Sequence, residues 1–129
     1  LHSFDWNLLE DCHRLAPEFP RSYLSQLPES SDDPFEKPPD EISPDFASFI
    51  GSIPEAIEAA GGHLWCPYFK DVTTDLVTEA HWLGLPVCTW TVNEVEDIEN
   101  VIDMGVDGII TDYIDRAKKI LQSRGLRWR

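Results

Sequence analysis

Short apolar runs alternate with longer amphipathic stretches along the chain, most clearly across residues 86–112. Residues 87–92 are rich in β-branched side chains and stand between a proline and an asparagine, which predicts a buried strand. Apolar positions then recur at helical spacing over 95–104, and Gly105 follows as a left-handed helix end. Residues 106–111 predict a second strand. A helix of about ten residues with short connections suits a parallel crossover, so we expect a β-α-β unit.

The same alternation runs through the earlier part of the chain. Residues 1–4, 22–27 and 63–67 predict further strands. From residue 22 onward, we expect the strands to lie parallel and to neighbour one another in chain order. Three helices end in a glycine immediately before a strand, as the αβ loops of repeated β-α units do. These glycines are Gly61, Gly84 and Gly105.

Each predicted helix begins at a polar residue whose side chain can cap it. The expected caps are Asp5, Ser52, Thr73 or Thr74, Asn93 and Asp112. The first of these helices is expected to bury Trp6, Leu9, Cys12 or His13, and Leu15. Asp112 has a second interpretation, because it also stands at the end of a strand, where it could belong to a binding site.

The spacing of the last three strands indicates the fold class. They begin about 22 residues apart, as in the repeat of a (β/α)8 TIM barrel. An open doubly wound sheet fits this periodicity equally well, although no G-x-G-x-x-G follows the first strand to support a dinucleotide site. About five β-α units do not close an eight-stranded barrel. We therefore expect an α/β fold in which residues 1–129 form the C-terminal part of one TIM-barrel-type domain.

Residues 28–46 interrupt the repeat. They contain five prolines and seven acidic residues against one lysine, a composition unsuited to helix or sheet. We expect an exposed loop, which could be an insertion or a functional lid.

Charge and hydropathy narrow the range of partners. The net charge of −14 argues against nucleic acid and against an anionic membrane surface. No run of about 18 apolar residues is present, so no transmembrane segment is expected. Cys12, Cys66 and Cys88 cannot all pair internally and have no zinc-site spacing. They predict reduced core thiols and a reducing compartment, with the cytoplasm favoured.

The candidate chemistry lies at the strand ends, where β/α barrels place their active sites. Phe4, Tyr68, Phe69 and Trp90 would form an aromatic rim there, suited to a small organic group such as glycerol or choline, or alternatively capping the barrel core. The histidines, including His63 and His81, stand isolated and are expected to be structural or on the surface. The sequence offers no nucleophile beside a base and no paired carboxylates on one strand.

The exact residues of three segments are more informative than their pattern of apolar and polar positions. "SFDW" at residues 3–6, "WCPYF" at 65–69, and "WTVN" followed by a helix and "GVDGIITD" at 90–112 occur in that order. Together they resemble the glycerophosphodiester phosphodiesterase family. The resemblance covers nearly the whole chain outside the acidic loop, but only the C-terminal half of the family's domain.

The resemblance implies an enzyme that hydrolyses glycerophosphodiesters to an alcohol and glycerol 3-phosphate with a divalent metal, Mg²⁺ or Ca²⁺. It implies substrate-binding roles for Ser3, Phe4, Tyr68 and Trp90. The family's "HRG", "HD" and "E-x-D" motifs are absent from this sequence, so no catalytic residue and no metal ligand are expected within it. Cys66 stands where a small polar residue would be expected.

Two alternatives stay open. The chain could be a non-catalytic half-barrel or assembly module, or it could be a phospholipase D-like relative with the same barrel and another substrate. The expected partners are a small-molecule glycerophosphodiester and either the missing N-terminal half of the barrel or a second copy of the chain.

Overall fold

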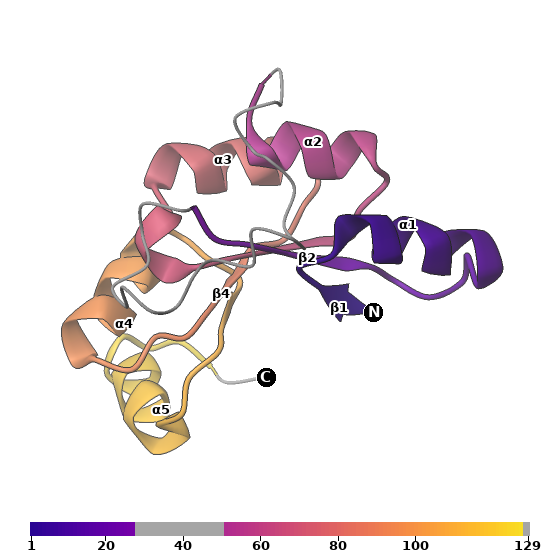
Figure 1. Ribbon diagram of the computed structural model, residues 1–129. Helices are drawn as coiled ribbons and strands as arrows, with labels where there is room; N and C mark the ends of the chain where they lie inside the picture. The colour runs from indigo at the N-terminus through magenta and orange to yellow at the C-terminus, as the bar shows by residue number, and fades with distance from the viewer. Residues whose placement is uncertain (28–50, 128–129) are drawn as a thin grey trace.

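The computed structural model describes residues 1–27 and 51–127. In these ranges, five short strands alternate with five α-helices, and the helices follow one another in an arc around one side of the strands (Figure 1). The elements are β1 (His2–Ser3), α1 (Trp6–Leu15), β2 (Ser22–Ser25), α2 (Ile53–Ala59), β3 (Leu64–Pro67), the 3-10 turn η3 (Phe69–Asp71), α3 (Thr74–Trp82), β4 (Cys88–Thr89), α4 (Val95–Asp103), β5 (Gly108–Ile109) and α5 (Ile114–Ser123). The α/β class is therefore confirmed. The predicted loop at 28–46 lies outside the described residues.

The strands are parallel and follow chain order, as predicted. β1, β2 and β3 form one sheet, and β4 and β5 form another. Two isolated parallel bridges, Trp65 with Val87 and Tyr68 with Trp90, join β3 to β4. Between these bridges lies Pro67, which has no N–H to donate, and this explains why the ladder is interrupted there.

Three of the predicted helix caps are confirmed. The Asp5 carboxylate accepts from the Leu8 N–H, and the Thr73 hydroxyl accepts from the Leu76 N–H. Ser52 forms a full capping box with Glu55 at the start of α2. Each bond satisfies a backbone donor that the first helical turn leaves unpaired.

Two other predicted caps are wrong. α4 is preceded by Glu94 rather than Asn93, and α5 by Tyr113 rather than Asp112, and neither helix has a side-chain cap. The side chains of Asn93 and Asp112 are instead bonded to each other. Leu15 was also expected in the core, but its side chain is 88% exposed because it lies in the last turn of α1, beyond the packed face.

Two clusters of buried apolar side chains fill the structure. The first cluster packs α1, α2 and α3 on the first sheet, and consists of Leu9, Tyr23, Ile57, Trp65, Val72, Val77, Ala80, Leu85 and Val87. The second cluster packs α4 and α5 together and consists of Val92, Ile98, Val101, Ala117 and Ile120. Val106 contacts both clusters and so links them.

Among residues 1–27 and 51–127, no helix has both the length and the apolar character needed to cross a bilayer.

Candidate functional site

Three aromatic side chains meet where β1, β3 and β4 end. The rings of Phe4 and Trp90 lie 5.4 Å apart, centroid to centroid, in an edge-to-face arrangement at 87°. The Tyr68 ring lies 5.3 Å from that of Trp90, and also contacts Phe69 at 5.0 Å. We call Phe4, Tyr68 and Trp90 the aromatic wall. All three are half-buried, so the wall keeps part of its surface open to solvent.

Trp90 is fixed at the centre of this wall by hydrogen bonds to β3 and the residues that follow it. Its indole N–H donates to the Cys66 carbonyl at 2.9 Å. Its backbone N–H donates to the Pro67 carbonyl at 3.2 Å, and its own carbonyl accepts from the Phe69 N–H at 2.9 Å. A large apolar ring held in one orientation presents a defined surface to a ligand at little cost in side-chain entropy.

Ser3 lies next to the wall in sequence but has a local role. Its hydroxyl accepts from the Asp5 N–H at 3.0 Å and shapes the turn into α1. The structure therefore brings together three of the four predicted substrate residues, Phe4, Tyr68 and Trp90, while the Ser3 hydroxyl is bonded within its own turn.

A polar cluster occupies the ends of β4 and β5, with Asn93 as its centre. The Asn93 amide donates to the Asp112 carboxylate at 2.8 Å. Its side-chain oxygen accepts from the Thr111 hydroxyl at 3.1 Å and from the Asp112 N–H at 3.0 Å. Arg116 donates to the Asn93 carbonyl and lies 3.7 Å from the Glu94 carboxylate. These bonds tie the two loops that follow the second sheet into one unit.

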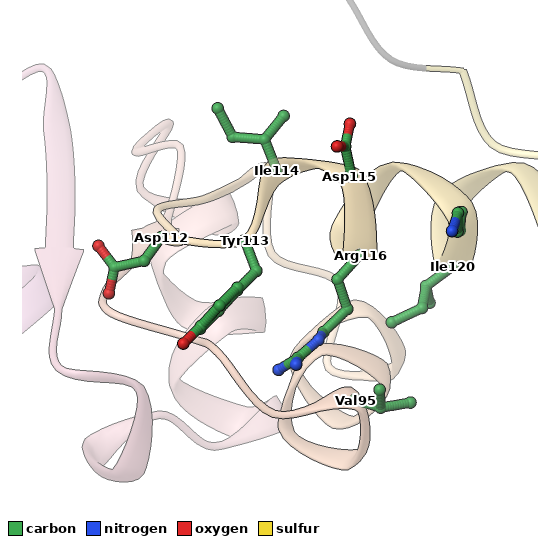
Figure 2. A pocket seen from close by; sticks show the side chains of 8 residues that line it. Val95, Asp112, Tyr113, Ile114, Asp115, Arg116 and Ile120 are labelled. Carbon is green, nitrogen blue, oxygen red and sulfur yellow. The ribbon is translucent and has the colours of Figure 1, made fainter.

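A shallow hollow of about 800 Å³ lies beside this cluster. Figure 2 shows Tyr113 and Arg116 on the same side of the chain, whereas Ile114 and Asp115 project from the other side. The Arg116 guanidinium lies over the Tyr113 ring, 4.4 Å from its centroid. None of the residues that line the hollow belongs to the aromatic wall. The aromatic wall is therefore a separate feature from this hollow.

The described residues do not provide a site for a divalent metal. Among residues 1–27 and 51–127, no group of three or more histidine, cysteine or acidic side chains is placed to hold an ion. At the strand ends, the Asp112 carboxylate is bonded to the Asn93 amide. Mg²⁺ and Ca²⁺ need several converging oxygen ligands, so the donor set present here does not fit either ion.

The expectation that His81 is isolated is wrong. Its Nε2 lies 2.8 Å from the Asp107 carboxylate, which also accepts from the Val87 N–H at 2.8 Å. The pair joins the end of α3 to the start of β5, at the edge opposite the aromatic wall. His2 is also paired, with its Nδ1 2.8 Å from the Ser22 hydroxyl. The spacing in sequence carries no signal for either pair, because each partner comes from a different β-α unit.

Comparison with known proteins agrees with this architecture. The model of the glycerophosphoryl diester phosphodiesterase family matches residues 1–116. A solved structure from Silicibacter pomeroyi, assigned as a glycerophosphoryl diester phosphodiesterase, is 54% identical with a TM-score of 0.87. It covers 99% of this chain, and the match spans 39% of that protein.

Two further relatives extend the comparison. A glycerophosphodiester phosphodiesterase of Bacillus altitudinis is 43% identical over 68 residues, which is 51% of this chain and 26% of that protein. An Oleispira antarctica phosphodiesterase, solved with the product sn-glycerol 3-phosphate, is 16% identical with a TM-score of 0.68. It covers 94% of this chain, the match spans 40% of that protein, and it supports the fold alone.

Parallel β-α units in chain order, together with the likeness to the Silicibacter pomeroyi structure, place the chain among TIM-barrel-type α/β proteins. Within that class, the chain belongs to the glycerophosphoryl diester phosphodiesterase family. It spans about two fifths of the length of the solved relatives that it matches.

Proposed function

We propose that this chain is the C-terminal part of a TIM-barrel phosphodiesterase that hydrolyses glycerophosphodiesters to an alcohol and glycerol 3-phosphate. The family match over residues 1–116 is the observation that carries the proposal. The relative from Oleispira antarctica was solved with sn-glycerol 3-phosphate, which is the product expected of that reaction. The aromatic wall stands at the carboxyl ends of parallel strands, where barrels of this class bind their substrates.

In this proposal the aromatic wall binds the organic part of the substrate. Phe4, Tyr68 and Trp90 present apolar ring surface to the carbon-bound hydrogens of a glycerol or head-group alcohol, and Ser3 supports the turn that carries Phe4. The wall holds the substrate in place and moves no proton. Its contribution therefore lies in binding and orientation.

The catalytic groups and the metal belong to the rest of the barrel. By family resemblance, the whole enzyme uses a divalent metal, Mg²⁺ or Ca²⁺, which polarises the phosphate, and histidines that transfer protons. The described residues lack a matching ligand set, so no step of the reaction is assigned to them. The isolated 129-residue chain is expected to be inactive.

Exposed apolar side chains around α4 and α5 also support the proposal that another part of the barrel packs against this chain. Val95, Ile110, Tyr113 and Ile114 are each at least two fifths exposed, and Ile114 reaches 58%. We propose that the N-terminal part of the barrel covers this surface and completes both the core and the active site. Without that part, a second copy of the chain would take its place.

Mixing the two halves of the enzyme tests the proposal. The isolated chain should show no turnover of glycerophosphocholine with Mg²⁺ or Ca²⁺, and adding the N-terminal half should restore it. In the intact enzyme, Trp90→Ala should lower kcat/KM by up to about tenfold, chiefly through KM, because an aromatic contact contributes about 0.5–1.5 kcal/mol.

Trp82→Ala is the matched control for this experiment. The Trp82 side chain is 87% exposed on α3 and takes no part in the aromatic wall, so its removal should leave kcat/KM unchanged. Turnover by the isolated chain above an enzyme-free blank would contradict the proposal. Restored activity that Trp90→Ala leaves intact would exclude the wall from substrate binding.

A further inference from the structure

Two cysteines that the proposed function does not use lie side by side where the two sheets meet. Each bridge between β3 and β4 pairs a residue with the one 22 positions later, and Cys66 and Cys88 have the same separation. The two cysteines are therefore directly opposite each other, with side chains on one face. Neighbouring strands run about 4.8 Å apart. That separation falls within the Cα–Cα distance of about 4.4–6.8 Å that a disulfide spans.

The two thiols also interact chemically. A hydrogen bond from the Cys88 thiol lowers the pKa of Cys66, and the Ser22 hydroxyl, 3.2 Å from the Cys66 sulfur, adds to this effect. The same bond to Cys66, together with burial, raises the pKa of Cys88. The Cys66 sulfur therefore has the greater thiolate character, and the thiolate is the reactive form of cysteine.

The two cysteines also differ in how far they are buried. Cys66 is 1% exposed, whereas Cys88 is half-buried and gives a small solute a route to the pair. Gly108 lies opposite Cys88 on β5, and a Cβ at that position would come within 2.8 Å of the Cys88 sulfur. The glycine thus provides the space that the Cys88 side chain occupies.

The pair lies where one bond of the ladder between β3 and β4 is missing. Pro67 cannot donate to β4, so the backbone bonds fall on either side of the cysteines. On one side the Trp65 N–H donates to the Pro86 carbonyl at 3.0 Å, and on the other the Phe69 N–H donates to the Trp90 carbonyl at 2.9 Å. A covalent link at this point would join two sheets that the ladder leaves incompletely connected.

We propose that Cys66 and Cys88 form a redox-active thiol pair, a modification site at which a peroxide produces an intramolecular disulfide between β3 and β4. The Cys66 sulfur attacks one oxygen of hydrogen peroxide, the O–O bond breaks, and water leaves with the thiol proton. The Cys88 sulfur then attacks the resulting sulfenic acid, the S–O bond breaks, and a second water leaves with the Cys88 proton. The thiols lose two electrons and the peroxide gains them.

The disulfide would form next to the aromatic wall. The carbonyl of Cys66 is the group that accepts the Trp90 indole N–H, so the oxidised pair fixes the backbone that orients Trp90. Disulfides also restrict the unfolded chain, and the oxidised protein should therefore have a higher Tm than the reduced protein.

Thiol counting on the 129-residue chain tests the proposal. The reduced protein is treated with hydrogen peroxide, denatured and titrated for free thiols, and a non-reduced digest is analysed by mass spectrometry. The count should fall from the three free cysteines of the reduced chain to the single thiol of Cys12. The digest should contain a Cys66–Cys88 peptide pair from monomeric protein, and dithiothreitol should reverse the change.

Single variants locate the reaction. Cys12→Ser should still lose both remaining thiols, because Cys12 lies on α1 and takes no part in the pair. Cys66→Ser and Cys88→Ser should form no intramolecular disulfide. The unsubstituted protein decides the question even if a variant fails to fold. Three unreacted thiols, a disulfide to Cys12, a disulfide between chains, or separate oxidation of each cysteine would each overturn the proposal.

Discussion

The half of the molecule built on β1, β2 and β3 buries larger side chains than the half built on β4 and β5. The first cluster contains Trp65 and Tyr23, each 1% exposed, whereas the second is wholly aliphatic. Every residue of β2 is buried, but neither residue of β5 is. Both halves repeat the same β-α unit, so the difference lies in the side chains each half carries and in the helices that pack on it.

The halves also differ in how they satisfy polar groups. In the first half, Arg21 is 2% exposed and donates to the Tyr23 hydroxyl at 2.9 Å and to the Gly61 carbonyl at 2.8 Å. Its Nε finds no partner among the described residues. In the second half, the bonds between Asn93 and Asp112 lie at the surface. Buried polar groups are costly to leave unpaired, so the first half should be the less tolerant of substitution.

The largest expected effect comes from Trp65→Ala. The substitution removes a buried ring and leaves the buried Ser25 hydroxyl without the indole N–H that donates to it at 2.9 Å. We expect a loss of about 3–5 kcal/mol in the free energy of unfolding, measured by urea denaturation. Trp82→Ala should change it by less than about 0.5 kcal/mol, because that ring is exposed. Equal losses for the two variants would contradict the expected stabilisation by the buried Trp65 ring.

A matched pair of isoleucines compares the two halves directly. Ile57 in the first cluster and Ile98 in the second are both fully buried. Truncation to alanine should cost about 2–5 kcal/mol at either position, with Ile98→Ala at the lower end. The smaller second cluster is flanked by the partly buried side chains of Ile102 and Ile109, which can shift toward the space that Ile98 leaves. A larger loss for Ile98→Ala, by the same denaturation measurement, would reverse the comparison.

The smallest expected effect is a pH dependence that belongs to the first half. Burial raises the pKa of Tyr23, and the opposing charge of Arg21 offsets this only in part. In the unfolded chain, tyrosine ionises near pH 10, so above about pH 10 the unfolded state loses its proton first. Stability is therefore retained below that pH and lost as the pH rises through the folded pKa. Tyr23→Phe should flatten this decline in alkaline denaturation curves, and an unchanged slope would assign it to other groups.

The sequence by itself determined the order of strands and helices and the family. Asp5, Ser52 and Thr73 could be identified as helix caps because each bonds a backbone N–H three residues away. Such contacts are local and depend little on the rest of the fold. The three glycines before the later strands have positive φ angles, as their positions predicted.

Only the tertiary structure decided which distant side chains meet. Asn93 and Asp112 have the residue types of helix caps, but they lie 19 positions apart and bond to each other where two strands end together. His81 and Asp107 are 26 positions apart in the sequence, and Cys66 lies opposite Cys88, which is 22 positions later. Each of these pairs depends on the register and order of parallel strands. Register is set by the packing of whole elements, and no short stretch of sequence contains it.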